Sequence, residues 1–250
     1  MALSLLILLA GFFAQLVDGS LSMGFGVTSS SLLLSLGFST ALASAAVHTA
    51  EIFTTLISGA SHLKLGNVDR KVFIPLTLSG VAGGIAGAAA SVLLQGMAAI
   101  RPFVAALLLV LGALIFLRFA SRRQDQPHQS VRRRSAALIG FPAAFVDAIG
   151  GGGWGPIATP SLIMRKSQPR QAIGTVSLAE FFITLSIALT FFALLPSVEW
   201  AAILPLVAGG ILAAPPAAYL AKRTPTRALG VAVGLFIMLL SVHTILRALF

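Results

Sequence analysis

Four carboxylates lie within otherwise apolar sequence, and they form two matched pairs. Asp18 and Glu51 in the first half correspond to Asp147 and Glu180 in the second half, each 129 positions later. An ionised carboxylate at the bilayer centre is costly, so such residues usually pair, bind a proton or line a hydrated path. We therefore expect the four acids to serve proton coupling or gating. The alternative is structural: the aspartates would cap a helix start and the glutamates would clamp neighbouring helices.

A glycine-rich run follows the second aspartate, with the sequence GGGGWGP over Gly150–Pro156. Glycines allow tight turns, and amides gathered at a helix start can hold an oxyanion without a charged side chain. The alternative is close helix packing through small residues. The candidate substrate-binding residues come from this run, its first-half counterpart and nearby hydroxyls: Ser20, Ser22, Gly24, Gly26, Thr28, Thr49, Gly150, Gly151, Gly152, Gly153, Trp154, Gly155 and Thr175.

His48 lies three residues before Glu51, so a helix would place both side chains on one face. An imidazole exchanges protons near neutral pH, which makes a proton-relay pair with Glu51 one interpretation and a packed histidine the other. The matching second-half position is Ser177, so any such role belongs to one half. The four histidines show no metal-ligand spacing and the chain has no cysteine, so we expect neither a metal site nor a cofactor.

Composition assigns the chain to the membrane. It is 57% hydrophobic and 10% charged, with a mean hydropathy of +0.98. Apolar stretches of spanning length recur from end to end, which predicts an all-α polytopic membrane protein. The six continuous spans are expected at 40–60, 72–94, 102–118, 170–194, 200–220 and 228–247.

Residues 3–36 and 137–164 are each predicted to form a broken or re-entrant helix pair. Each contains two apolar stretches of about 14 residues around a polar, glycine-rich centre, and such a stretch reaches roughly 21 Å of the roughly 30 Å hydrocarbon core. The economical interpretation is two half-helices that enter and leave on the same side. The break would then lie at depth, against protein or a water-filled cavity.

The two halves open with one motif, GFFAQLVD at Gly11–Asp18 and GFPAAFVD at Gly140–Asp147. We divide the chain into a first repeat (1–118), a basic linker (119–136) and a second repeat (137–250). Each repeat is expected to hold a broken helix pair plus three transmembrane helices. A duplicated bundle of this kind is a common transporter design.

Charge predicts how the repeats are oriented. If each broken pair returns to its own side, the repeats have inverted topology, and 15 of the 17 basic residues share one face, all except Arg101 and Arg247. The positive-inside rule then predicts a multi-pass protein of the inner (plasma) membrane, with both termini external and the 119–136 loop cytoplasmic. The arginines of this loop are expected to contact anionic lipid headgroups rather than nucleic acid.

Several segments together carry a family resemblance. They are the duplicated Gly-Phe…Val-Asp opening, the run Gly150–Pro156, the stretch Gly174–Glu180, and the first-half segments Val47–Glu51 and Gly66–Asp69. In their order they resemble the sulfite exporter TauE/SafE family, also called the toluene sulfonate uptake permease group, over nearly the whole chain except the linker. The resemblance implies an inner-membrane carrier of small sulfur-containing or organic anions, most often an exporter. It also implies a substrate site along the segments after the two aspartates. In the first repeat serines and Met23 replace several glycines, which leaves the substrate open.

We therefore predict a secondary transporter that exports small anions such as sulfite or sulfonates, with proton coupling through the buried acids. The alternatives are a passive anion channel and a membrane assembly or scaffold protein that moves no solute. An enzyme is not expected, because the sequence lacks an HExxH motif and a serine–histidine or paired-aspartate protease pattern. The expected partners are a small anionic solute and the bilayer, and the sequence does not determine an oligomeric state.

Overall fold

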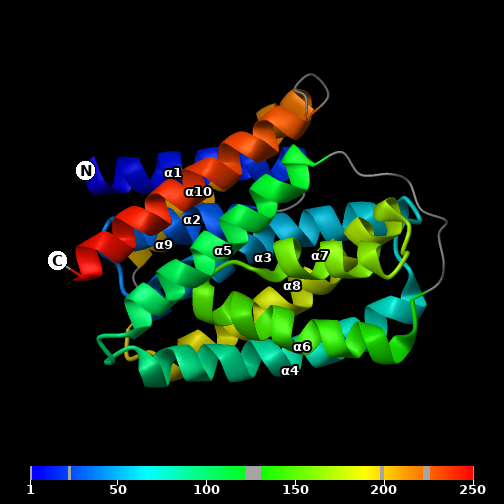
Figure 1. The fold of residues 1–250 in the computed structure, drawn as a ribbon, viewed down its shortest axis with the longest axis horizontal. Coiled ribbons are helices and arrows are strands. Elements are labelled where there is room, and N and C mark those ends of the chain that lie inside the picture. The colour runs from blue at the N-terminus through cyan, green and yellow to red at the C-terminus, as the bar shows by residue number, and fades with distance from the viewer. Residues whose placement is uncertain (1, 22–23, 122–130, 198–199, 222–225, 250) are drawn as a thin grey trace.

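The computed structural model describes residues 2–21, 24–121, 131–197, 200–221 and 226–249, which form ten α-helices and no strand (Figure 1). The first half contains α1 (Ala2–Leu21), α2 (Phe25–Ser35), α3 (Thr40–Lys64), α4 (Arg70–Leu94) and α5 (Ile100–Ala120). The second half contains α6 (Arg133–Gly150), α7 (Trp154–Met164), α8 (Pro169–Leu194), α9 (Trp200–Ala221) and α10 (Thr226–Leu249). The all-helical architecture is therefore confirmed. Residues 122–130 of the predicted linker lie outside the described residues.

Local sequence explains several helix boundaries. The Ser39 side chain accepts a hydrogen bond from the Leu42 amide at 3.3 Å and starts α3. The Asp69 carboxylate likewise accepts from the Lys71 amide at 2.9 Å and starts α4, while Pro169 occupies the start of α8. These groups satisfy amides that have no partner within the helix, and proline has no amide hydrogen to satisfy.

The helix pairings follow the sequence duplication. The bounds of α2 and α7 are related by the same 129-residue offset as the acids, and α3 and α8 begin at equivalent positions. In the bundle α4 packs on α6 and α1 packs on α9, while α3 packs on α8 and α5 on α10. Exchanging the two halves therefore turns the first of these pairings into the second and leaves the other two unchanged.

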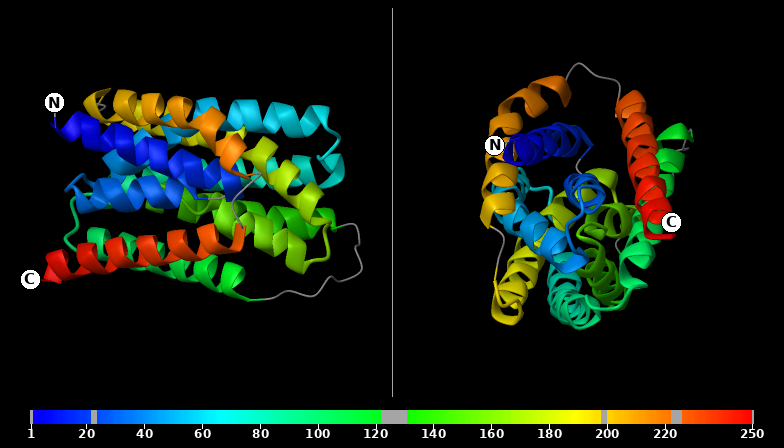
Figure 2. Two further views of the ribbon diagram at one scale, coloured as in Figure 1. Left: turned by 90° about the horizontal axis from the view of Figure 1, so that it is seen from above. Right: turned by 90° about the vertical axis from the view of Figure 1, so that its left-hand side faces the viewer.

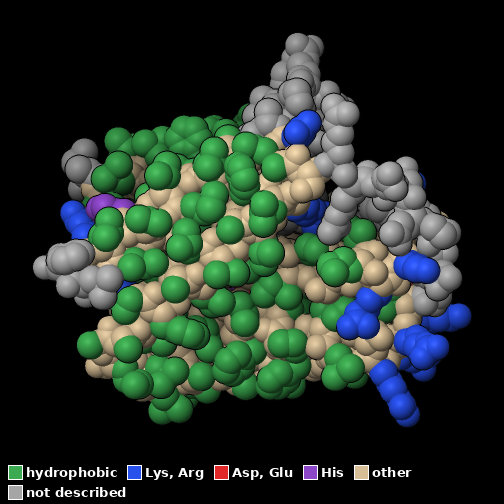
Figure 3. All heavy atoms as spheres, in the orientation of Figure 1, with side chains coloured by type: hydrophobic (Ala, Val, Ile, Leu, Met, Phe, Trp, Pro, Cys, Tyr) green, Lys and Arg blue, Asp and Glu red, His purple; other side chains and the backbone are tan. Residues whose placement is uncertain are grey.

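Five helical segments are long and apolar enough to cross a membrane: Thr40–Lys64, Arg70–Leu94, Ile100–Ala120, Arg170–Leu194 and Gly230–Arg247. They match five of the six predicted spans. The sixth expected span is α9, whose described apolar stretch Trp200–Ala213 is shorter. Among the five, α3 has the most buried apolar stretch, so it lies at the centre of the bundle. Hydrophobic side chains cover the outer face in Figure 3, whereas lysine and arginine gather toward one end.

The broken pairs differ from the predicted pairs of equal arms. The second arms, α2 and α7, have 11 residues each and reach about 16 Å. The first arms, α1 and α6, have 20 and 18 residues, so they are longer than expected. The reason is that Asp18 and Asp147 both remain helical. The turn into α2 comes later, at Gly24, whose φ of 136° favours glycine, just as Gly151 ends α6 with a φ of 68°.

The ends of the chain share one end of the molecule. Figures 1 and 2 show the start of α1 and the end of α10 close to one extremity, whereas α5 ends and α6 begins toward the other. The helices α1 and α6 consequently run in opposite directions along the long axis.

Candidate functional site

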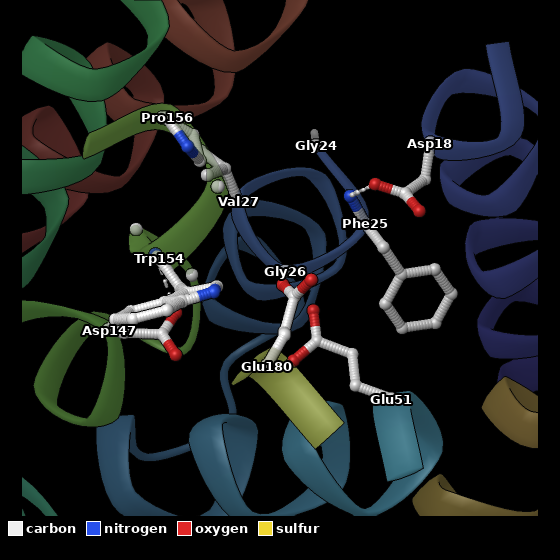
Figure 4. Close-up of a pocket in the computed structure, with 13 residues that line it drawn as sticks. Asp18, Gly24, Phe25, Gly26, Val27, Glu51, Asp147, Trp154, Pro156 and Glu180 are labelled. Atoms are coloured by element: carbon white, nitrogen blue, oxygen red, sulfur yellow. Dashed lines mark hydrogen bonds between the residues drawn. The ribbon is translucent and has the colours of Figure 1, made fainter. Parts of the chain in front are cut away.

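The two helix breaks meet at one small cavity in the middle of the bundle (Figure 4). All four predicted acids line it. In this conformation its interior is scarcely wider than a water molecule. The lining residues are Asp18, Gly24, Phe25, Gly26, Val27, Glu51, Asp147, Gly152, Gly153, Trp154, Gly155, Pro156 and Glu180. We call this space the acid chamber.

Each aspartate contacts the start of the short helix in its own half. The Asp147 Oδ1 atom accepts a hydrogen bond from the Trp154 amide at 3.1 Å, and Asp18 Oδ1 accepts from the Phe25 amide at 3.4 Å. In both halves the spacing is seven residues. The aspartates therefore supply the cap that the preceding glycines, Gly24 and Gly153, cannot offer. A carboxylate at this position also faces the positive end of the helix dipole.

His48 joins this arrangement from the other half of the protein. Its Nε2 atom lies 3.1 Å from Asp147 Oδ2, and its Nδ1 atom lies 2.8 Å from the Ser44 carbonyl oxygen. Because a carbonyl oxygen only accepts, Nδ1 must carry a hydrogen. Nε2 and Oδ2 are then at hydrogen-bonding distance across the two halves of the protein.

Spacing along the helix predicts a pair of His48 with Glu51, whereas in the structure His48 bonds Asp147. Helical side chains lean toward the N-terminus of their helix, so the imidazole of His48 leans away from Glu51, which follows it along α3. The Ser44 hydroxyl, one turn earlier, also bonds the second half by donating to the Ala148 carbonyl at 2.6 Å.

Glu51 is 5% exposed and reaches the start of α2. Its carboxylate accepts a backbone hydrogen bond from Gly26. A side chain on Gly26 would place its Cβ 2.9 Å from Glu51 Oε1 and 2.8 Å from the Gly152 Cα. Gly26 is thus required by close approach: here the two glycine breaks contact each other backbone to backbone.

Glu180 approaches from α8 and is half-buried. Figure 4 shows its carboxylate pointing toward that of Glu51, so the two glutamates face each other across the chamber. Two neighbouring negative charges in an apolar bundle repel each other strongly, which favours a bound proton at this pair.

The remaining predicted binding residues are distributed differently. Thr28, Thr49, Thr175, Gly150 and Gly151 do not line the acid chamber. Thr49 Oγ1 donates to the Ala45 carbonyl of its own helix at 2.6 Å, and Thr175 Oγ1 accepts from the Asp69 amide at 2.9 Å. The Gly151 carbonyl accepts a hydrogen bond from Ser30, so this glycine shapes the turn.

The first-half serines cannot be placed in the site. Ser22 and the side chain of Ser20 lie outside the described residues, although the backbone of Ser20 belongs to α1.

Two further cavities adjoin the chamber, and of the residues that line them Asp18 and Glu180 were predicted from the sequence as site residues but the others were not. The larger, of about 1340 Å³, is lined by Gln15, Asp18, Phe53, Thr54, Thr55, Leu56, Ile57, Ser58, His62, Ser177, Glu180 and Ile211. The sequence signal that could have indicated this cavity is the helical spacing from Glu51 to Thr55, Ser58 and His62, which places these polar residues on one face. The other, of about 910 Å³, is lined by Leu114, Ile115, Leu117, Arg118, Ser121, Pro156, Ile157, Pro160, Ser161 and Met164.

Comparison with known proteins gives one family. Residues 7–244 match the family described as Sulfite exporter TauE/SafE. The chain is 42% identical over 243 residues to the Bacillus subtilis (strain 168) protein named "Probable membrane transporter protein YtnM", an alignment covering 95% of this chain and 81% of that protein. No solved structure gives a significant match.

Proposed function

Because the chain belongs to the sulfite exporter TauE/SafE family, we propose that it is a secondary transporter that exports a small sulfur-containing or organic anion, such as sulfite or a sulfonate, across the plasma membrane. One observation carries the proposal: two short helices, α2 and α7, begin at a single chamber that four carboxylates line. Helix starts offer amide donors to an anion, and buried acids offer places for protons.

The amide donors at these helix starts already hold the protein's own carboxylates. The amides of Phe25, Gly26 and Trp154 are bonded by Asp18, Glu51 and Asp147 respectively. These carboxylates occupy the position that a substrate anion would take. Of the three, Asp147 is also held by His48, whereas a second carboxylate, that of Glu180, faces Glu51 across the chamber, so we infer that Glu51 is the carboxylate that moves away from its amide.

Charge balance supports proton coupling in this site. An anion that enters a chamber with four carboxylates is repelled unless protons bind there. A proton on Glu51 weakens its hold on the Gly26 amide and frees that donor for the substrate. With one proton for each monoanion the transported pair is electroneutral, and export follows the outward gradient of the substrate.

We also propose that residues 1–118 and residues 137–250 are two repeats of inverted topology. The opposite directions of α1 and α6, and the common end of the two termini, support this proposal. Basic side chains gather at the opposite end (Figure 3), which by the positive-inside rule faces the cytoplasm. The 119–136 loop is then cytoplasmic, near anionic headgroups, and both termini are external.

Flux in proteoliposomes tests this function. Purified protein is reconstituted, and sulfite efflux is measured at increasing internal concentration, with and without an imposed pH gradient. We expect saturable efflux that moves protons in the same direction as the anion. Flux that rises linearly without saturation would instead indicate a passive channel, and no flux of sulfite, sulfonates or carboxylates would remove the transporter proposal.

A further inference from the structure

The larger of the two adjoining cavities opens directly from the acid chamber. It shares Asp18 and Glu180 with the chamber, one residue from each half of the protein. Its walls come from α1, α3, α8 and α9. The smaller cavity, between α5 and α7, meets the chamber at Pro156 alone. A solute leaving the chamber therefore meets two carboxylates on one side and a proline ring on the other.

Polar residues of α3 line the larger cavity in a stripe. From Glu51 the stripe continues through Thr55, Ser58 and His62, spacings of three or four residues that keep one helix face. Opposite the stripe is Gln15 of α1, which is 7% exposed and whose Oε1 atom has no hydrogen-bond partner among the described residues. Such a buried, unpartnered oxygen is satisfied when water fills the cavity.

The stripe leads to the basic end of the molecule. The last turn of α3 contains His62 and Lys64, and the His62 ring lies 3.2 Å from the Asn67 side chain. Arg170, exposed near the start of α8, is close enough to act on the charge of His62. The cavity mouth is therefore positively charged, which raises the local concentration of anions.

The deeper wall of this cavity, unlike its apolar rim, is unsuited to a lipid chain. Apolar residues at its rim, Phe53, Ile57 and Ile211, are 50%, 69% and 55% exposed and face outward. The deeper wall includes Asp18 and Glu180, and carboxylates within the membrane normally face water or protein. The apolar rim is therefore suited to contact with lipid acyl chains, whereas the space along the deeper wall is suited to water.

From these observations we propose that this cavity, which we call the α3 vestibule, is the hydrated route by which a small anion passes between the basic end and the acid chamber. The proposal rests on the proposed transport function. In this conformation the protein is then open toward its basic face. Ser58 and Ser177, which lie between the mouth and Glu180, would contact the anion on its way.

Single cysteines can test the vestibule, because the chain has none of its own. Ser58→Cys places a thiol in the α3 vestibule, and Ser161→Cys places one in the smaller cavity as a matched control from an equally half-buried serine. Each variant, in lipid nanodiscs, is treated with a methanethiosulfonate reagent that carries an anionic sulfonate. We expect the thiol at position 58 to react at least tenfold faster than that at 161, and sulfite to slow its reaction.

Flux measurements complete the test. Modified S58C should lose most of its sulfite efflux in proteoliposomes, whereas modified S161C should retain it. The proposal is overturned if position 58 reacts only with an uncharged, lipid-soluble maleimide, which would indicate an acyl chain, or if its modification leaves efflux unchanged. If neither wild type nor unmodified S58C transports any anion, the transport function fails, while reagent access still reports whether the cavity is hydrated.

Discussion

The imidazole of His48 and the carboxylate of Asp147 lie 99 residues apart in the sequence and 3.1 Å apart in the structure. This pair connects α3 of the first half to the end of α6 in the second, and Asp147 in turn caps α7. Asp18, the residue equivalent to Asp147, has no histidine partner of this kind among the described residues. Ser177 stands at the position where the sequence duplication would place a second histidine. The two helix starts at the chamber thus differ: the capping carboxylate of α7 is paired with a histidine and that of α2 is not.

His48→Ala should strongly destabilise the protein. Removing one partner of a buried ion pair leaves an uncompensated carboxylate, which typically costs about 3–5 kcal/mol. We expect a large fall in the thermal unfolding midpoint in detergent, measured by intrinsic fluorescence. The control is His243→Ala, because that histidine is exposed on α10 and should tolerate the change. Equal midpoints for the two variants would show that the pair contributes nothing.

Asp147→Asn should be milder than His48→Ala. An asparagine oxygen still accepts from the Trp154 amide, and its amide group can donate to a neutral imidazole at Nε2. We expect a stability loss of about 1 kcal/mol, the usual net value of one hydrogen bond. A loss as large as that of H48A would mean that the charge on Asp147, rather than its hydrogen bonds, holds the pair together.

Glu51→Gln should abolish the pH dependence of transport. A glutamine cannot take up or release a proton. No negative charge at position 51 then competes with the substrate anion for the Gly26 amide. Proteoliposomes with the variant should still exchange sulfite for sulfite, while a pH gradient should no longer drive net uptake. The double variant with Glu180→Gln is expected to behave in the same way. Unchanged proton coupling in the double variant would remove the glutamates from the mechanism.

Gly26→Ala should impair the site because no space exists for a methyl group there. Its Cβ would lie 2.8 Å from the backbone of Gly152 and 2.9 Å from the Glu51 carboxylate, so the two helix breaks would have to separate. Overpacking of this kind costs about 1–3 kcal/mol. We expect at least a tenfold loss of efflux. Gly96→Ala is the matched control, because no atom lies within 4 Å of the position that its methyl group would take.

Gly11→Val and Gly140→Val should lower stability by similar amounts. These glycines open the duplicated motif, and each contacts the backbone of a neighbouring helix: a Cβ on Gly11 would lie 3.0 Å from the Leu206 carbonyl carbon, and one on Gly140 would lie 3.1 Å from the Gly80 nitrogen. Small residues at such contacts let helices pack closely in a membrane. A fall in the unfolding midpoint of only one variant would contradict equivalent packing of α1 on α9 and α6 on α4.

The sequence by itself determined the class of protein, most helix positions and the identity of the four acids. Hydropathy and span length are local properties, and lipid requires the backbone of each span to satisfy its own hydrogen bonds, so spans such as 72–94 are close to α4. The 129-residue offset can likewise be read directly from the amino-acid sequence. It relates Asp18 to Asp147 and Glu51 to Glu180 without any knowledge of packing.

Only the tertiary structure decided which groups those acids contact. Spacing along α3 placed His48 with Glu51, whereas the crossing of the two halves brings Asp147 to its Nε2 atom instead. The same crossing sets Gly26 against Gly152 and opens the α3 vestibule beside Glu180. Side-chain partners from opposite halves depend on how helices approach one another in three dimensions, and periodicity within one helix carries no information about that approach.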